Sequence, residues 1–376
     1  METAQRRRKR KNPVTNLFNP VEKNLFVSMY GIDVIPNQAF GVQFSLANIE
    51  GIIEASGAHI DGKLSNFSSR ETLDRHAMEL GRMQYIAMLS ESTASTCIFP
   101  QQRYASFFLS TCGEADPLHA MEPLVYLFRP VKAEVRYFTS TPIDQVFEDE
   151  MPSDDDLFWE QFDEKVPYYY DLKSKEKEIK GIYFDLVSSI HDAGALPLAL
   201  ADESETDPVE DNLVVSMYGV THEKLAELMH ACAVPALENI ILKSNNRVVG
   251  RMSKELPALG HEGLFGFSYV SQLGDGVAAF HVSPESNYAS FFISGSSQSE
   301  PILSLKALIE VFQPRKAEVR YFSSSSIREV DAIKYRPKAF WRELDKADVP
   351  DNYRISNTEK LLNEFYFDLS RATGSA

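Results

Sequence analysis

The heptapeptide KAEVRYF at residues 132–138 occurs a second time, unchanged, at residues 316–322. Four other stretches recur in the same order: VSMYG at 27–31 and 215–219, YASFF at 104–108 and 288–292, FW at 158–159 and 340–341, and YFDL at 183–186 and 366–369. The offset between copies stays close to half of the 376-residue chain. One unit of about half the chain is therefore present twice.

Each copy alternates strand patterns with single helix patterns. Apolar runs predict strands at residues 25–30, 84–89, 104–109, 133–138 and 181–187, and at 213–218, 276–282, 288–293, 317–322 and 364–369. Apolar residues at helical spacing predict helices at 117–128, 301–312 and 221–232, the last with Thr221 as N-cap. Strands joined by single helices and hairpin-length links predict an α+β fold, with two antiparallel sheets packed as related sheet–helix layers.

The repeat and the composition of the segments between its copies predict the domain organisation. An acidic stretch, ADESETDPVEDN at residues 201–212, separates the copies, and the expected linker is residues 199–212. The first repeat half is expected at 18–198 and the second at 213–376, packed together as one unit. Residues 1–17 carry the basic run of residues 6–11 and are expected to be a disordered tail.

Composition and charge exclude several function classes. Hydrophobic residues make up 44% of the chain, which is enough for a sizeable core. The net charge of −16 argues against general nucleic-acid binding, because such binding depends on Lys and Arg to neutralise phosphates. The apolar runs are too short for a membrane span, and three cysteines do not form a disulfide framework. A cytoplasmic location is expected, although the basic tail would also suit nuclear entry.

The places where the two copies differ are the most informative for function. LSEST at residues 89–93 of the first copy corresponds to LGDGV at 273–277 of the second. The first copy has Cys112 after its YASFF strand, where the second has serines and a glycine. The second copy has His281 where the first has Cys97. Each difference alone is more often structural, but together they predict one composite site built from both halves.

Five blocks resemble the eukaryotic-type S-adenosylmethionine decarboxylases, which use a pyruvoyl group. They are FNPVEK at 18–23, YIAMLSES at 85–92, FLSTCG at 108–113, GFSY at 266–269 and HVSPE at 281–285. The blocks follow one another in the family's order and reach across most of the chain. The resemblance implies an internally duplicated four-layer α/β/β/α sandwich, with two antiparallel sheets and outer helices.

By this resemblance the chain is a pro-enzyme that cleaves itself between Glu91 and Ser92. The Ser92 hydroxyl would attack the Glu91 carbonyl carbon, and the ester formed would then break by elimination. Ser268 would stabilise the tetrahedral intermediate and His281 would remove the Cα proton. Residue 92 would become a pyruvoyl group at the new N-terminus. The resulting α and β chains would stay associated, and the family also allows for a homodimer.

The same resemblance assigns roles in decarboxylating S-adenosylmethionine for spermidine and spermine biosynthesis. The pyruvoyl ketone would bind the substrate amine as a Schiff base and act as the electron sink, so no metal or separate cofactor is required. Cys112 would return a proton to the substrate carbon, and Glu22 belongs to the catalytic group. The expected substrate-binding residues are Phe18, Leu89, Phe265 and Glu285.

Two other functions remain open on the sequence alone. The chain would be a regulatory relative if it kept the fold but activated a partner decarboxylase subunit. It would be a duplicated binding module if none of these residues reacted. Self-cleavage into chains of 91 and 285 residues separates the decarboxylase and the regulator from the binding module.

Overall fold

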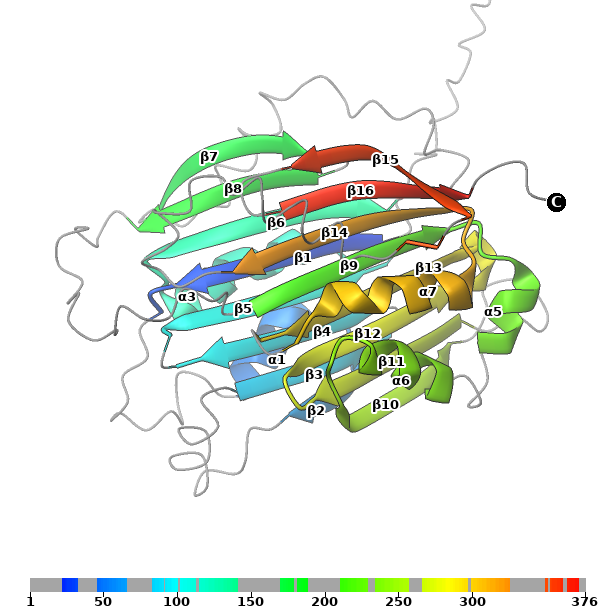
Figure 1. The fold of residues 1–376 in the computed structure, drawn as a ribbon. Helices are drawn as coiled ribbons and strands as arrows, with labels where there is room; N and C mark the ends of the chain where they lie inside the picture. Colours follow the sequence, from blue (N-terminus) through cyan, green and yellow to red (C-terminus); the bar gives the residue numbers. More distant parts are fainter. Residues whose placement is uncertain are drawn as a thin grey trace, which may run out of the picture.

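The structure is a computed structural model, and Figure 1 shows two large sheets lying face to face. It describes residues 22–32, 46–65, 83–90, 92–100, 102–112, 115–140, 170–178, 181–188, 210–228, 234–256, 266–296, 299–324, 349–350, 352–360 and 364–371.

The two halves form one eight-stranded antiparallel sheet each, with the same strand order. The N-terminal sheet runs β2 (Ile60–Ser65), β3 (Met83–Leu89), β4 (Thr93–Phe99), β5 (Tyr104–Thr111), β1 (Glu22–Tyr30), β6 (Lys132–Ser140), β8 (Gly181–Ser188) and β7 (Tyr170–Glu178). The C-terminal sheet runs β10 (Val248–Leu256), β11 (Gly266–Leu273), β12 (Gly276–Ser283), β13 (Tyr288–Gly295), β9 (Glu210–Tyr218), β14 (Lys316–Ser324), β16 (Glu364–Arg371) and β15 (Tyr353–Lys360). The predicted duplication therefore holds strand by strand.

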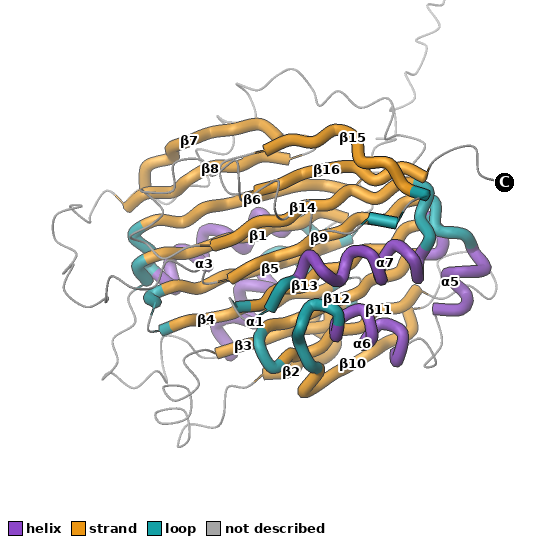
Figure 2. The backbone as a smooth tube through the Cα atoms, viewed as in Figure 1, coloured by secondary structure: helices purple, strands orange, loops and turns teal. Residues whose placement is uncertain are grey.

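Helices cover the outer face of each sheet, which confirms the predicted four-layer sandwich (Figures 1 and 2). The N-terminal sheet carries α1 (Leu46–Ala55) and α3 (Met121–Phe128). The C-terminal sheet carries α5 (His222–Leu228), α6 (Val234–Leu242) and α7 (Leu305–Phe312). One apolar cluster lies under each helix layer, and a third lies between the sheets.

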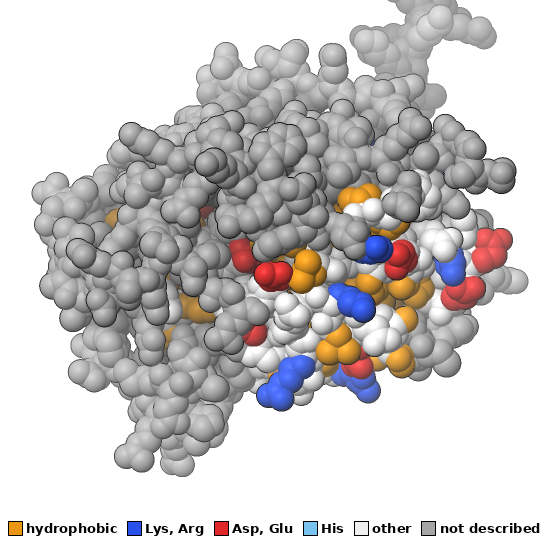
Figure 3. All heavy atoms as spheres, viewed as in Figure 1, with side chains coloured by type: hydrophobic (Ala, Val, Ile, Leu, Met, Phe, Trp, Pro, Cys, Tyr) orange, Lys and Arg blue, Asp and Glu red, His pale blue; other side chains and the backbone are white. Residues whose placement is uncertain are grey.

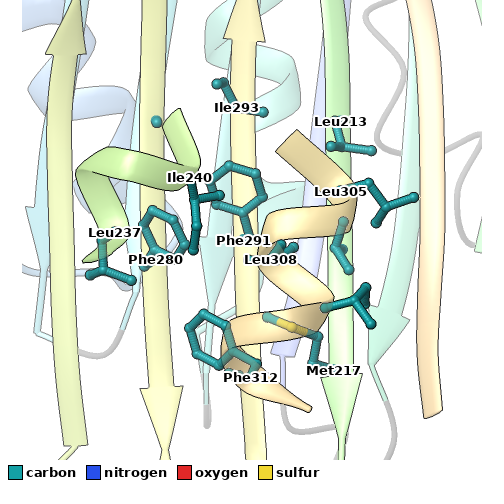
Figure 4. Packing of buried hydrophobic residues seen from close by; sticks show 14 of the residues in the cluster. Leu213, Met217, Leu237, Ile240, Phe280, Phe291, Ile293, Leu305, Leu308 and Phe312 are labelled. Carbon is teal, nitrogen blue, oxygen red and sulfur yellow. The ribbon is translucent and has the colours of Figure 1, made fainter. Parts of the chain in front are cut away.

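Helix α7 shows how the apolar spacing is used. Its buried residues Leu305, Leu308 and Phe312 face the sheet, where Phe291 and Met217 lie beneath them (Figure 4). The expected helix at 301–312 begins with a 3-10 turn, Pro301–Ser304, because proline fits a first turn. The first copy repeats this arrangement at Pro117–Ala120 and α3.

Several expected boundaries need correction. Strand β9 begins at Glu210, so the last three residues of the expected linker belong to a strand. The helix expected at 221–232 has Thr221 as its cap, since the Lys224 N–H donates to Thr221 Oγ1 at 3.4 Å. The described part of this helix is His222–Leu228, residues 229–233 lie outside the described residues, and α6 follows at Val234. The sequence did not predict strands β2, β4, β7, β10, β11 and β15, or helix α6.

Polar side chains tie the two sheets together within the apolar inner layer. Ser28 of β1 bonds Ser324 of β14 at 3.0 Å, and Ser140 of β6 bonds Ser216 of β9 at 2.8 Å. These four hydroxyls are buried and satisfy one another. These bonds hold β1 against β14 and β6 against β9, which positions side chains from both halves around common points.

The described surface mixes acidic, basic and apolar side chains on the face that carries α6 and α7 (Figure 3). Within the described ranges, none of the helices has the length and apolar character needed to cross a membrane.

Candidate active site

Ser92 lies at the end of the tight turn that joins β3 to β4. The N–H of Leu89 donates to the carbonyl oxygen of Ser92 at 2.9 Å, which closes the turn. Ser92 is 1% exposed, and its hydroxyl donates to Glu22 Oε1 at 3.4 Å. The turn therefore places a buried hydroxyl directly after the backbone bond that the sequence predicted to be cleaved.

Glu22 is a buried carboxylate that collects hydroxyl groups from both sheets. Ser92 and Ser110 donate to Oε1 from the N-terminal sheet, and Ser290 of β13 donates to the same oxygen at 3.2 Å. Tyr288 donates to Oε2 at 2.6 Å. Burial, followed by the charge of Glu22, holds the pKa of the Tyr288 phenol well above its usual value, so the phenol remains a donor. Four donors offset the cost of burying this carboxylate.

Cys112, His281 and Ser268 form a connected row beside Glu22. Ser268 and His281 are cross-strand partners on β11 and β12, and Ser268 Oγ lies 3.1 Å from His281 Nδ1. The other ring nitrogen, Nε2, lies 3.8 Å from the sulfur of the half-buried Cys112. Burial lowers the pKa of His281, although Glu22 opposes the shift, so the ring is neutral near pH 7. A neutral imidazole in contact with a thiol can accept and return protons.

A narrow cavity lies between the sheets at this point. The N-terminal sheet supplies a largely polar wall: Glu22, Asn24, Thr93, Ser110 and Phe108. The C-terminal sheet supplies a largely apolar wall, with His281 and Ser290 as its polar members. Both halves of the chain are thus needed to build the cavity.

No family model matches this chain. A comparison with the curated proteins also finds no match. Among solved structures, the AdoMetDC-delta26 monomer of Trypanosoma brucei is similar, with a TM-score of 0.40 and 14% sequence identity. The match covers 71% of this chain and 96% of that chain. A likeness this distant carries no argument about function, so the functional interpretation depends on the geometry of the site.

The structure brings five of the predicted site residues together: Glu22, Ser92, Cys112, Ser268 and His281. Leu89 is buried beside Ser92 in the turn. Glu285 lies in the 3-10 turn Pro284–Ser286 after β12, and its side chain is exposed. The predicted residues Phe18, Glu91 and Phe265 lie outside the described residues.

Sequence reasoning missed Asn24, Ser110, Tyr288 and Ser290. A signal for two of them was present, because Tyr288 and Ser290 belong to the repeated YASFF stretch. Polar residues that recur in a strand of both copies indicate a shared internal contact. The reciprocal contact is also present, since Tyr104 of the first copy donates to Glu210 of the second at 2.9 Å.

The corresponding cluster around Glu210 lacks the serine of the turn and the imidazole. Glu210 is buried and accepts from Tyr104 and Ser294, as Glu22 accepts from Tyr288 and Ser110. Burial raises the pKa of Glu210, and hydrogen bonds to hydroxyl and thiol groups oppose the shift. The strand registers of the two copies correspond. Cys97 therefore occupies the position in the first copy that His281 has in the second, and Gly276 occupies the position in the second copy that Ser92 has in the first. Only one of the two equivalent turns carries a hydroxyl at this position.

The turn at Gly276 has no room for a side chain, so a Gly276→Ser change is expected to lower the free energy of unfolding by more than about 2 kcal/mol. A Cβ at this residue would lie 1.8 Å from the backbone oxygen of Ser294. Gly274→Ser is the matched control, because its Cβ would meet the flexible side chain of Arg247 at 3.3 Å. Urea denaturation measures both variants, and equal unfolding midpoints would contradict this packing argument.

Proposed function

We propose that this chain is a pro-enzyme that cleaves itself between Glu91 and Ser92 and then decarboxylates S-adenosylmethionine. One observation carries the proposal: the Ser92 hydroxyl donates to the buried carboxylate of Glu22, and the His281 imidazole, which lines the same cavity as Glu22, contacts the Cys112 thiol. The equivalent turn of the second copy has glycine instead of serine. We therefore assign self-cleavage to the turn of the first copy, which ends with Ser92.

Cleavage begins with the Ser92 hydroxyl. Its oxygen attacks the Glu91 carbonyl carbon, the carbon–nitrogen bond breaks, and the hydroxyl proton moves to the freed nitrogen, which leaves an ester. Glu22 accepts a hydrogen bond from this hydroxyl and holds it in place. Ser268 contacts His281 and is the group that we assign to stabilising the tetrahedral intermediate.

His281 acts as the base in the elimination that follows. It removes the proton from Cα of residue 92, and the Glu91 carboxylate leaves with the electrons of the ester bond. The dehydroalanine formed at residue 92 then tautomerises and is hydrolysed by water, which releases ammonia and leaves a ketone. The pair formed by β3 and β4 is held by its whole ladder, so the 91-residue and 285-residue chains stay together after the turn is cut.

The position of Ser92 fits a pyruvoyl group, because its side chain is buried beside Glu22, a residue that lines the cavity. A ketone at this position supplies the electron sink that decarboxylation of an amino acid requires. Cys112 returns a proton to the substrate carbon once carbon dioxide has left, and His281 resupplies the thiol through their contact. We assign Glu285 to the ribose hydroxyls, Leu89 to a substrate contact, and Phe18 and Phe265 to the adenine.

The rate of self-cleavage is expected to be constant between about pH 6.5 and 8 and to fall at lower pH. Burial lowers the pKa of His281, so the neutral base persists below the usual titration range and is lost only on further acidification. Timed denaturing gels of freshly synthesised chain at a series of pH values measure this rate. A decline that already begins between pH 8 and 7 would show that the group in control does not have a lowered pKa.

The deciding experiment is an intact mass and a denaturing gel of the purified wild-type chain, combined with a carbon dioxide release assay. Fragments of 91 and 285 residues, a blocked N-terminus on the larger one and carbon dioxide from S-adenosylmethionine would support the proposal. Cleavage without carbon dioxide would indicate a regulatory relative. An intact, inert chain would indicate a binding module.

A further inference from the structure

Asn24 presents an unsatisfied amide inside the cavity. It is 1% exposed, lies two residues after Glu22 on β1, and lines the cavity wall. Its Nδ2 group has no hydrogen-bond partner in the structure. A buried donor without an acceptor is costly, so its presence beside a reactive group indicates a ligand that supplies the acceptor.

The other donors on the cavity wall already have acceptors. Ser110 and Ser290 donate to Glu22, and Thr93 donates to the carbonyl oxygen of Ala87 at 3.0 Å. The carboxylate of Glu22 is itself saturated with hydroxyl donors. The Asn24 amide is therefore the donor on this wall that remains available for a bound molecule, and it suits an oxygen acceptor.

We propose that the Asn24 carboxamide binds the α-carboxylate of the substrate, an inference that rests on the proposed function. The strand register places Asn24 opposite Ser110, and Ser110 opposite Thr93, the residue after Ser92. The substrate carboxylate shares a carbon with the amine that must reach residue 92. With only β5 between its strand and β4, the amide is positioned to hold the carboxylate and orient the bond that breaks.

The duplication supplies a matched control in Asn212. It occupies the equivalent place on β9, is fully buried, and leaves both Nδ2 and Oδ1 without hydrogen-bond partners. Its neighbour Ser294 corresponds to Ser110, but the turn nearby carries Gly276 in place of the reactive serine. Asn212 therefore has the same burial as Asn24 and no substrate to hold.

The test compares Asn24→Leu with Asn212→Leu in the processed protein. The Michaelis constant for S-adenosylmethionine is measured together with the inhibition constant of its decarboxylated product, which lacks only the carboxylate. Asn24→Leu is expected to raise the Michaelis constant roughly tenfold or more and to leave product inhibition unchanged. Asn212→Leu is expected to change neither. Both variants should keep or raise the melting temperature, because leucine replaces an unsatisfied amide of similar size.

The assignment of Asn24 would be overturned if Asn24→Leu weakened the affinity for both ligands equally, or for neither. The second result would indicate that a buried water is the acceptor. A wild-type chain that stays intact or releases no carbon dioxide refutes the proposed function separately. The same two ligands are then titrated into the intact chain by calorimetry. If Asn24→Leu weakens the binding of S-adenosylmethionine and leaves the binding of the decarboxylated product unchanged, the inference is retained. Any other pattern, including no binding of either ligand, would overturn it.

Discussion

A Ser92→Ala chain is expected to remain a single polypeptide of 376 residues, whereas the wild-type chain separates into pieces of 91 and 285 residues. Alanine removes the only atom that attacks the Glu91 carbonyl, so no ester forms and the later steps have no starting point. The side chain is buried and contacts Glu22 through a long hydrogen bond of 3.4 Å, so little stability depends on it. Denaturing gels and intact mass measure the outcome, which should be complete loss of cleavage.

Ser95→Ala is the matched control for this change. Ser95 is also a buried serine of β4, but it lies three residues away from the turn. The Ser95→Ala chain should cleave itself at the wild-type rate and give the same fragments. Cleavage of the Ser92→Ala chain at residue 91 would mean that another group, or a contaminating protease, cuts the turn.

The sequence predicted the architecture because duplication doubles each weak signal. A single apolar run such as 133–138 is ambiguous, but its unchanged recurrence at 317–322 makes a shared central strand convincing. Strand β4 was missed for the opposite reason. Its residues TASTCIF are mostly small and polar, yet all seven are buried because both faces of this strand are covered by other layers.

The candidate site was predictable where the two copies differ. Ser92, Cys112 and His281 stood out because their counterparts in the other copy lack the same chemistry. Contacts between the sheets could not be predicted in this way. Tyr288 reaches Glu22 across 266 residues of sequence, and nothing in the order of the chain shows which residues of the two inner faces meet.

A His281→Ala chain is expected to stall at the ester rather than at the peptide. Ser92 keeps its hydroxyl and its contact with Glu22, so the acyl shift can still occur. The base that removes the Cα proton is missing, and ketone formation should fall by about 100-fold to 10,000-fold. An ester in the backbone is cleaved by hydroxylamine under denaturing conditions. The variant should therefore give 91-residue and 285-residue fragments only after this treatment, with a free serine amine on the larger one.

His119→Ala is the control, because the exposed side chain of His119 belongs to the 3-10 turn Pro117–Ala120, which packs on the outer face of the N-terminal sheet, away from the cavity. It should mature like the wild-type chain and resist hydroxylamine. The Ser92→Ala chain should resist it as well, since it forms no ester, and this contrast separates attack from elimination. Ketone formation at the wild-type rate without His281 would assign the proton transfer to another group. In that case Cys112, which lies 3.8 Å from the imidazole, would be the first residue to replace.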